Sequence, residues 1–262
     1  MSRPEQVRRR SSRQAAAGRQ LVLLTTCVVA AAAIGVGLVR EAANPRFAVD
    51  IVAIRGLVHT SAPDVVTAAA LQPGQNAWLV DRRAVATRIE ALPWVGAVAL
   101  HVSWPNRLAI DVSERKAVAL VLLDAPSLGL PRPRYATIDD TQRVLALSDA
   151  ADPGSQLPVL VVVPLPTDAT PGNTLARPEV GQALDACGAL RALGLQISEI
   201  AIAPSTGISA TADRNLRVLF GEDEDLARKA QLFQAIVAKI STPSRVAYVD
   251  VRSVRAPTVL YR

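Results

Sequence analysis

An uninterrupted uncharged run from Gln20 to Val39, closed by Arg19 and Arg40, constrains this chain more than any other segment. At about 1.5 Å of rise per residue, such a run makes a helix of roughly 30 Å, the thickness of the hydrocarbon core of a bilayer. A single segment in lipid must satisfy its own backbone groups, and a helix does so. The sequence therefore predicts a transmembrane helix over residues 20–39, with the lipid bilayer as the first expected partner.

The residues before this run are strongly basic, with six arginines and one glutamate in residues 1–19. Because basic residues that flank a span stay in the cytoplasm, we expect residues 1–19 to be a cytoplasmic tail and residues 40–262 to be extracytoplasmic. Two alternatives stay open at this point. A cleaved signal peptide has a shorter apolar region of about 7–15 residues, and a mitochondrial presequence is amphipathic rather than uniformly apolar.

The net charge of +6 belongs almost entirely to the tail, whose arginines and glutamate sum to +5. The rest of the chain is close to neutral and has no basic stripe, so no nucleic-acid partner is predicted. DNA binding by the tail remains a minor alternative to contact with anionic lipid head groups. The two cysteines, Cys27 and Cys187, are separated by the predicted membrane boundary, so the exported part must rely on its packed core.

The first exported stretch reads as a small β-α-α-β-β unit. Alternation over residues 48–55 predicts a strand that Gly56 ends. One helix is expected to start at residues 61–64, because proline near a first turn loses little by lacking an N–H. A second is expected to start at Asp81, a good N-cap. A strand over residues 95–104 and a second over residues 108–112 then follow, joined by a turn at residues 105–106.

Four short sequence motifs in this unit resemble those of the POTRA domain of the bacterial division family FtsQ/DivIB. They are a glycine after the first strand, the sequence Leu-Pro-Trp-Val from residue 92, Trp-Pro at residue 104, and Glu-Arg at residue 114. The resemblance places a POTRA-like domain at residues 48–118. It implies a structural role for Gly56, Pro93, Trp94, Trp104, Pro105, Glu114 and Arg115. Both Trp94 and Trp104 are expected to be core or rim packing residues.

The remainder, residues 119–262, resembles the β-rich second domain of the same family. Residues 136–144 are expected to hold the end of one strand, a turn at residues 139–142 and the start of a further strand. Another strand is expected at residues 158–163, and a helix over residues 179–193 that Gly194 closes. A later helix over residues 222–240 has four acidic residues in its expected first turn, where the helix dipole favours them. The alternative reading of these carboxylates as a metal site is weaker, because no paired histidine accompanies them. Residues 124–133 read as a linker.

Residues 246–252 read Val-Ala-Tyr-Val-Asp-Val-Arg. This run resembles the region near the C-terminus of FtsQ that forms a sheet edge for the partner FtsB. The resemblance implies β-augmentation, in which a partner strand pairs with unpaired backbone groups at an edge. The residues expected to bind the partner are Tyr248, Val249, Asp250, Val251, Arg252 and Ser253, with Tyr248 as the aromatic anchor. The alternative is that Tyr248 and Val249 only complete the sheet of the domain itself.

No catalytic constellation is recognisable in the sequence. The two histidines, His59 and His101, fall in no metal-ligand spacing, and no nucleophile elbow or phosphate-binding glycine loop occurs. We therefore expect a protein without catalytic residues, metal, cofactor or small-molecule substrate. An envelope hydrolase with a site assembled only in space is a minor alternative.

These features together predict an α+β protein with one N-terminal transmembrane helix, a POTRA-like β-α-α-β-β domain and a β-rich mixed domain. The resemblance implies a non-enzymatic scaffold of the cell membrane, enriched at the division septum, which binds FtsB and FtsL and helps control septal peptidoglycan synthesis. One alternative is a POTRA-bearing chaperone module of envelope assembly that takes no part in division. A second is an envelope sensor that signals through its tail.

Overall fold

The computed structural model describes residues 25–41, 44–124, 133–151, 156–212, 215–241 and 245–262. Residues 25–41 are helical and exposed. The expected basic tail and residues 20–24 of the expected span lie outside the described residues. Within the described ranges, no helix is both long enough and apolar enough to cross a bilayer.

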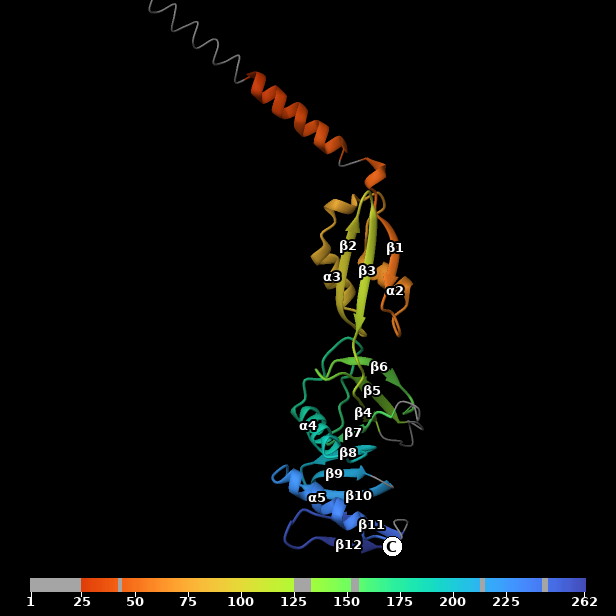
Figure 1. Cartoon of the computed structure of the whole chain (residues 1–262), viewed down its shortest axis with the longest axis vertical. Coiled ribbons are helices and arrows are strands. Elements are labelled where there is room, and N and C mark those ends of the chain that lie inside the picture. The colour runs from red at the N-terminus through yellow and green to blue at the C-terminus, as the bar shows by residue number, and fades with distance from the viewer. Residues whose placement is uncertain (1–24, 42–43, 125–132, 152–155, 213–214, 242–244) are drawn as a thin grey trace, which may run out of the picture. The chain divides into compact units, whose positions relative to one another are not determined.

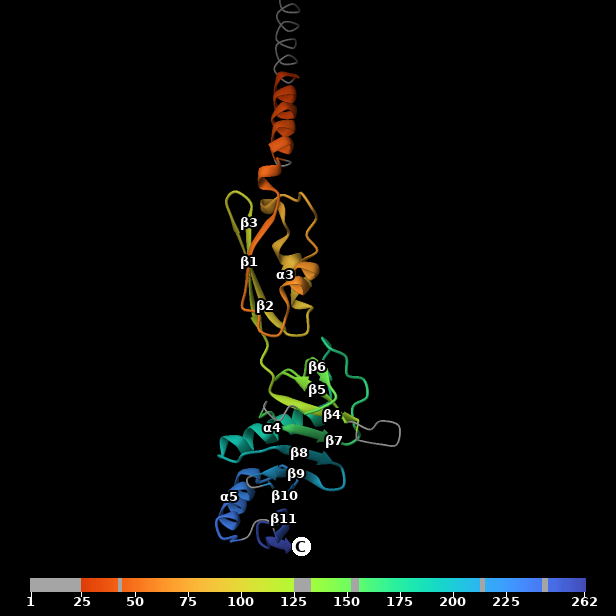
Figure 2. The same ribbon diagram turned by 90° about the vertical axis from the view of Figure 1, so that its right-hand side faces the viewer.

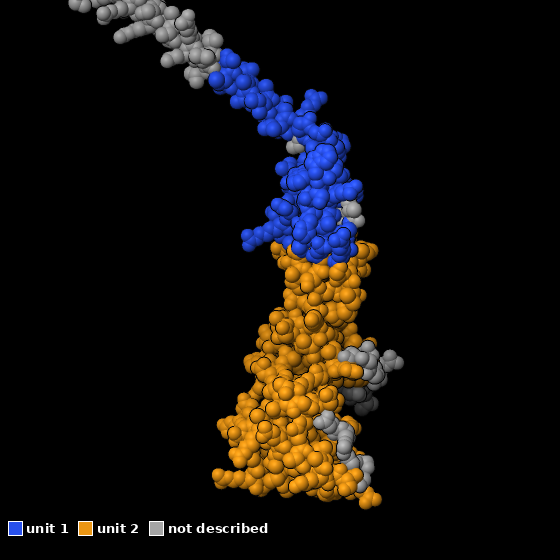
Figure 3. Space-filling model, viewed as in Figure 1, with its two compact units in different colours: residues 1–55, 69–86, 99–111 blue, residues 56–68, 87–98, 112–262 orange. Residues whose placement is uncertain are grey.

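The chain forms two compact units, which Figure 3 shows in different colours. One unit contains residues 1–55, 69–86 and 99–111, and the other contains residues 56–68, 87–98 and 112–262. The strands form two separate sheets, one with three strands in the order β1-β3-β2 and one with nine in the order β12-β11-β10-β9-β8-β7-β4-β5-β6. The α+β class predicted from the sequence is thereby confirmed.

The three-stranded part follows the predicted order of elements. These are η1 (Pro45–Phe47), β1 (Asp50–Arg55), α2 (Ala62–Ala69), η2 (Ala77–Leu79), α3 (Arg82–Glu90), β2 (Val95–Ser103) and β3 (Arg107–Glu114). Both expected helix starts are present, because Ser61 Oγ accepts the Asp64 N–H at 3.3 Å and Asp81 Oδ1 accepts the Ala84 N–H at 3.0 Å. Strands β1 and β3 pair in parallel.

The nine-stranded sheet mixes parallel and antiparallel pairs. Its strands are β4 (Ala119–Asp124), β5 (Arg134–Ile138), β6 (Val144–Ser148), β7 (Val159–Val162), β8 (Glu199–Ala203), β9 (Gly207–Ala212), β10 (Leu216–Gly221), β11 (Val246–Asp250) and β12 (Thr258–Tyr261). The pairs β4–β7, β7–β8 and β10–β11 are parallel. The pairs β4–β5, β5–β6, β8–β9, β9–β10 and β11–β12 are antiparallel.

Two helices, α4 (Pro178–Ala192) and α5 (Leu226–Val237), pack on this sheet and on each other, as Figures 1 and 2 show. Between helices and sheet, Phe220 and Phe233 meet edge to face with ring centroids 6.4 Å apart. Cys187 on α4 is buried, and burial raises the pKa of its thiol although Arg191 opposes the shift. Gly194 has the positive φ of +87° that a residue closing a helix requires.

The later helix is shorter than its sequence pattern predicts. The expected range was residues 222–240, but α5 begins at Leu226, so the four acidic residues precede the helix and do not fill its first turn. Asp225 lies at φ +57°, a left-handed conformation that does not continue a helix. Lys229, on the first turn of α5, is buried, and its Nζ donates to the carbonyl oxygen of Glu222 at 2.8 Å. Strands β4, β8, β9 and β12 have no counterpart among the expected elements. Residues 125–132 of the expected linker lie outside the described residues.

Candidate functional site: an open edge of the nine-stranded sheet

The segment expected to form the sheet edge lies one strand inside it. Strand β11 pairs with β10 on one side, through Val218 with Val249, and with β12 on the other, through Val249 with Val259. Its backbone is therefore engaged on both sides, and the expectation of an edge at residues 248–253 is wrong. The edge of the sheet on this side is β12, and β6 forms the opposite edge.

The six residues expected to bind the partner divide into two groups. Val249 and Val251 are completely buried, so their side chains complete the core of the domain. Tyr248 and Asp250 are half-buried, while Arg252 and Ser253 are exposed. Tyr248 is opposite Leu260 of β12, and residues opposite each other on paired strands share one face of a sheet. Tyr248 therefore lies on the face away from Val249, next to a residue of the true edge.

An ion pair stiffens the turn that leaves β11. Arg252 donates from Nε to Asp250 Oδ1 at 3.0 Å and from Nη2 to Oδ2 at 2.6 Å, and its backbone N–H also bonds Oδ1. These bonds from Arg252 lower the pKa of the Asp250 carboxyl although partial burial opposes the shift, and the same pairing raises the pKa of Arg252. A Cβ on Gly221 would meet Arg252 Cγ at 3.0 Å, so the arginine stem lies against that glycine.

Strand β12 exposes apolar side chains as well as a free backbone edge. Leu260 is 49% exposed and Tyr261 is 60% exposed. Among the described residues, no strand pairs with the outer side of β12, so alternate N–H and C=O groups there have no ladder partner. Exposed apolar residues on an unpaired edge are the features that β-augmentation uses.

The family motifs do not assign the residues of β12 to the site, although the sequence carries a signal for this strand. Thr258, Val259, Leu260 and Tyr261 form a run of β-branched, aliphatic and aromatic residues, which favours a strand. Pro257 directly before the run is also permissible only at the start or edge of a sheet. The run has four residues, too short for its alternation to stand out.

The surroundings of this edge are basic. Residues 245–262 contain four arginines, at positions 245, 252, 255 and 262, and a single carboxylate, that of Asp250. All four arginines are exposed, and Arg252 is the one that pairs with Asp250. A strand added to this edge would therefore meet positive charge at its flanks, which favours a partner with acidic residues there.

Three of the motif residues named from the sequence, Gly56, Trp94 and Glu114, lie together elsewhere, at the turn that the Glu114 carboxylate holds. Its oxygens accept the backbone N–H groups of Val58, His59 and Thr60 at 2.8 to 3.0 Å, and His59 Nδ1 lies 3.0 Å from Oε2. Burial raises the pKa of Glu114, but these hydrogen bonds outweigh it and hold the pKa at about 2. We call this arrangement, residues 58–60 with Glu114, the Glu114 corner.

Gly56 and Trp94 complete the Glu114 corner. Gly56 has φ +82°, and a Cβ there would collide with the carbonyl oxygen of Val112. Trp94 stacks on the His59 ring with centroids 3.9 Å apart and planes 7° from parallel. Gly56 and Trp94 thus constrain the backbone of this corner by a close approach and a stacked ring. Pro93, directly before Trp94, is half-buried.

Trp104 does not take the position predicted for it. Its side chain is 73% exposed, so the expectation of core or rim packing is wrong. Trp104 precedes the turn at Pro105, whose carbonyl oxygen accepts a hydrogen bond from Trp78 Nε1 at 3.0 Å. The turn is therefore held by the indole of Trp78, and the Trp104 ring projects into solvent.

Arg115 bonds two segments of its compact unit. Its Nε donates to the Val95 carbonyl oxygen at 3.0 Å, and its Nη1 donates to Asp139 Oδ2 at 2.7 Å. Asp139 is 2% exposed and also accepts bonds from Thr141 and Arg143. Burial raises the pKa of Asp139, but the bonds from Thr141, Arg115 and Arg143 lower it further than burial raises it. The expected turn at residues 139–142 is thus built on a buried carboxylate.

Among the described residues, no three His, Cys, Asp or Glu side chains are grouped so that they could hold a metal ion.

Comparison with known proteins identifies two matching family models. Residues 47–115 match the POTRA domain of FtsQ type, and residues 130–252 match the C-terminal domain of cell division protein FtsQ/DivIB. A relative from Myxococcus fulvus, named cell division protein FtsQ, is 34% identical over 80 residues, which are 30% of this chain and 28% of the relative. One of the same name from Anaeromyxobacter sp. (strain K) is 27% identical over 191 residues, 70% of this chain and 61% of the relative. The matches span less than two thirds of the length of either relative.

Proposed function

Because this chain belongs to the FtsQ/DivIB family of cell-division proteins, we propose that it is a non-enzymatic scaffold of the division machinery whose open strand β12 binds a partner strand. Membership of this family supports a role in cell division and interaction with other division proteins. The open edge of the nine-stranded sheet, with Leu260 and Tyr261 exposed on β12, is the observation that carries this proposal.

The partner that fits β12 is an extended segment with apolar residues at alternate positions and acidic residues at its ends. Backbone pairing supplies the affinity, and side chains such as Leu260 and Tyr248, on one face, supply selectivity. The arginines around the edge favour acidic flanks. The resemblance to FtsQ names FtsB as the candidate for this strand and FtsL as its companion in the complex. Control of septal peptidoglycan synthesis would follow from assembling these proteins.

We further propose that residues 20–39 are a single membrane span, with residues 1–19 in the cytoplasm and residues 40–262 outside it. The uncharged run, the basic flank and the membrane association expected for this family support this topology. The span would hold the partner-binding edge near the membrane and raise the effective concentration of membrane-bound partners. Enrichment at the septum belongs to the same proposal.

Substituting an aspartate at the edge tests the binding mode. Leu260→Asp places a carboxylate on the apolar face of β12, and we expect it to weaken binding of the FtsB–FtsL complex from the same host at least tenfold, the loss expected at an interface anchor. Binding is measured by biolayer interferometry with the full-length chain in nanodiscs.

The matched control is Leu147→Asp, which makes the same change on β6 at the opposite edge of the same sheet, where Leu147 is 37% exposed. We expect this variant to bind as the parent does. If Leu147→Asp weakens binding while Leu260→Asp leaves it unchanged, the partner uses the other edge and the proposal for β12 is wrong.

Depletion of the protein in its host tests the cellular role. Elongated or branched undivided cells, with a fluorescent fusion at midcell, are the expected result. Normal division with a diffuse membrane signal would instead favour the alternative of an envelope-assembly module.

A further inference from the structure

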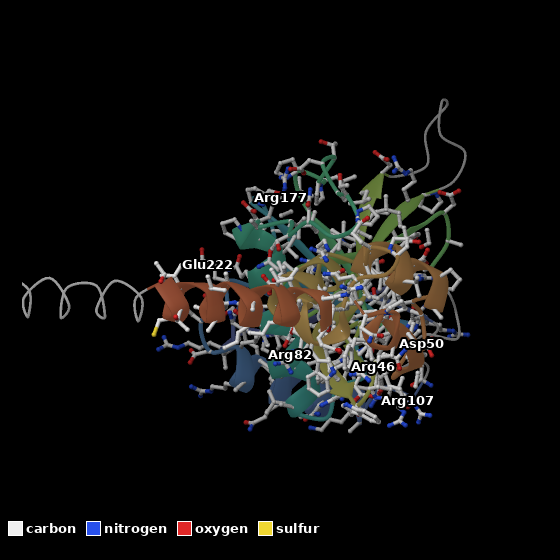
Figure 4. All side chains as sticks on the ribbon, turned by 90° about the horizontal axis from the view of Figure 1, so that it is seen from above. Arg46, Asp50, Arg82, Arg107, Arg177 and Glu222 are labelled. Carbon is white, nitrogen blue, oxygen red and sulfur yellow. The ribbon has the colours of Figure 1, made fainter. Side chains whose placement is uncertain are left out.

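Three exposed apolar side chains and three arginines gather on the unit that contains residues 44–55, 69–86 and 99–111. Trp78, Leu79 and Trp104 are 53%, 68% and 73% exposed. Arg46, Arg82 and Arg107 are exposed as well, and Figure 4 labels them. We call these six residues the tryptophan–arginine patch. None of them belongs to the nine-stranded sheet or to its open edge.

Hydrogen bonds bring the segments of the patch together. The indole of Trp78 donates to the carbonyl oxygen of Pro105, which joins η2 to the turn that carries Trp104. The Asp50 N–H donates to the Asn106 carbonyl oxygen at 3.0 Å, and Asp50 is the register partner of Arg107. The Val49 N–H donates to the Gln75 carbonyl oxygen at 2.8 Å. Residues 45–50, 75–79 and 104–107 therefore lie next to one another and make up one surface, and Arg82 follows Leu79 by three residues in the chain.

This surface is continuous with the end of the apolar helix. The Asn44 N–H donates to the Glu41 carbonyl oxygen at 3.1 Å, and Arg46 Nη2 pairs with the Glu41 carboxylate at 3.1 Å. Only residues 42 and 43 lie between the helix over residues 25–41 and Asn44. At no more than about 3.6 Å per residue, the chain cannot carry the patch far from the end of that helix.

The composition of the patch is that of a membrane interface. Tryptophan is enriched at the boundary between lipid and water, because its ring is apolar and its N–H is polar. Arginines near an anionic leaflet gain electrostatic energy from the head groups. The acidic residues nearby are engaged in part, since Glu41 pairs with Arg46 and Asp81 caps α3, while Asp50 is exposed. The short chain between residues 41 and 44 keeps this composition close to the end of the apolar helix, where the head groups of the proposed bilayer would lie.

We propose that the tryptophan–arginine patch docks on the membrane surface, with Trp78, Leu79 and Trp104 in the interface and Arg46, Arg82 and Arg107 on anionic phospholipid head groups. This inference rests on the proposed membrane span of residues 20–39. Docking would fix the orientation of the first extracytoplasmic domain relative to the bilayer.

Tryptophan quenching in vesicles tests the docking. The full-length chain is reconstituted in phosphatidylcholine vesicles that contain phosphatidylglycerol, with bromine atoms on the acyl chains near the head groups. The chain has three tryptophans, so Trp94→Phe leaves Trp78 and Trp104 as reporters. The double variant Trp78→Phe/Trp104→Phe leaves Trp94, which the nine residues of β2 place about 30 Å from Trp104 at strand rise. We expect brominated lipid to quench the first variant and to leave the second unquenched.

Charge variants test the head-group contact. Arg82→Gln and Arg107→Gln should each lower the ratio of docked to undocked chain about fivefold, as expected when one arginine leaves an anionic surface. Arg228→Gln, an exposed arginine on α5, is the matched control and should leave quenching unchanged. Quenching that is the same in vesicles of phosphatidylcholine alone would overturn the role of anionic lipid.

The outcomes separate this inference from the membrane span. If the chain fails to float with the vesicles, the span itself is wrong. If the chain floats but Trp78 and Trp104 are not quenched, the span stands and the docking is wrong, which leaves the patch for a protein partner. Circular dichroism of each variant confirms that the fold is retained.

Discussion

The Glu114 corner and the open edge at β12 differ in whether their backbone polar groups have hydrogen-bond partners within the chain. At the Glu114 corner, one carboxylate satisfies three backbone N–H groups and a histidine, and its side chain is only 7% exposed. At the open edge, the backbone groups on the outer side of β12 have no ladder partner among the described residues, and Leu260 and Tyr261 are exposed. The first region is complete in the isolated chain, while the second is completed by another chain in our proposal.

This difference separates motif residues from binding residues. Gly56, Trp94, Glu114 and Arg115 are recognisable in the sequence because the backbone needs those residue types at those positions. Their replacement should therefore damage stability. Residues at the open edge can vary as long as the strand persists, because backbone groups do most of the pairing. Their replacement should damage binding and leave stability nearly unchanged.

The largest expected loss of stability is for Gly56→Ala. The new Cβ would collide with the Val112 carbonyl oxygen and would also strain a residue at φ +82°, so we expect a loss of about 3 kcal/mol. All three tryptophans lie between residues 78 and 104, so fluorescence during urea unfolding reports this part of the chain.

Gly74→Ala is the matched control for that change. Gly74 has φ +76°, nearly the same conformation, but a Cβ there meets nothing within 4 Å. Only the backbone strain remains, about 1 kcal/mol. Equal losses for the two variants would show that the close approach of Val112 does not matter.

The next largest effect is expected for Glu114→Gln, which removes the charge that three N–H groups bond. We expect a loss of about 2–3 kcal/mol at pH 7. Because folding lowers the pKa of Glu114 from 4.5 to about 2, its stabilisation is complete above pH 4.5 and is lost as the pH falls toward 2. As the pH is lowered from 4.5 to about 2, the urea midpoint of the parent should decrease, and that of Glu114→Gln should decrease less steeply. Glu222→Gln, a change at an exposed glutamate, is the control and should follow the parent. If the midpoint of Glu114→Gln falls as steeply as that of the parent, Glu114 is not the group that causes the loss of stability at low pH.

A smaller effect is expected for Arg115→Gln. The substitution leaves Asp139, which is 2% exposed, without its cation, while the bonds from Thr141 and Arg143 remain, so we expect a loss of about 2 kcal/mol. A double-mutant cycle with Asp139→Asn should give a coupling energy above about 0.5 kcal/mol.

Arg134→Gln tests the same chemistry at an exposed pair. Arg134 lies 3.4 Å from Asp124, and both side chains reach solvent, so the loss should stay under about 1 kcal/mol. Calorimetry of the full-length chain measures both arginine variants, and a zero coupling for Arg115 with Asp139 would remove that pair as a stabilising contact.

The smallest effect on stability is expected for Leu260→Asp, the variant that should weaken partner binding most. Leu260 is 49% exposed and lies on the last strand of the sheet, so we expect a change within about 0.5 kcal/mol. The thermal midpoint of the full-length chain checks this. A large loss of stability would mean that β12 is a required part of the sheet, and the comparison between the two regions would no longer hold.

Local signals explain which elements could be predicted from the sequence. The starts of α2 and α3 lie where the sequence predicts them, with the predicted cap at Asp81 and a further cap at Ser61, and Gly194 follows α4 as expected. The face of α5 that carries Ala230 and Phe233 is buried as its spacing indicates. In each case, residues within about one turn of helix decide the outcome.

The order of strands could not be read in the same way. Placing β11 between β10 and β12 depends on pairing between residues far apart in the sequence, and no local pattern records which neighbour a strand takes. The edge was therefore assigned one strand too early. Trp104 was misjudged for a related reason, since the hydrogen bond that holds its turn comes from Trp78, a residue outside the motif.

The Glu114 corner should slow the exchange of backbone amide hydrogens with solvent. The amide hydrogens of Val58, His59 and Thr60 belong to a connection without helix or strand, where exchange with solvent deuterium is ordinarily complete early. Here each is bonded to a carboxylate whose side chain is 7% exposed and which stays charged down to about pH 2. These three hydrogens should persist as long as those of β3, so that the slowest-opening part of the domain includes what a ribbon drawing shows as a loop.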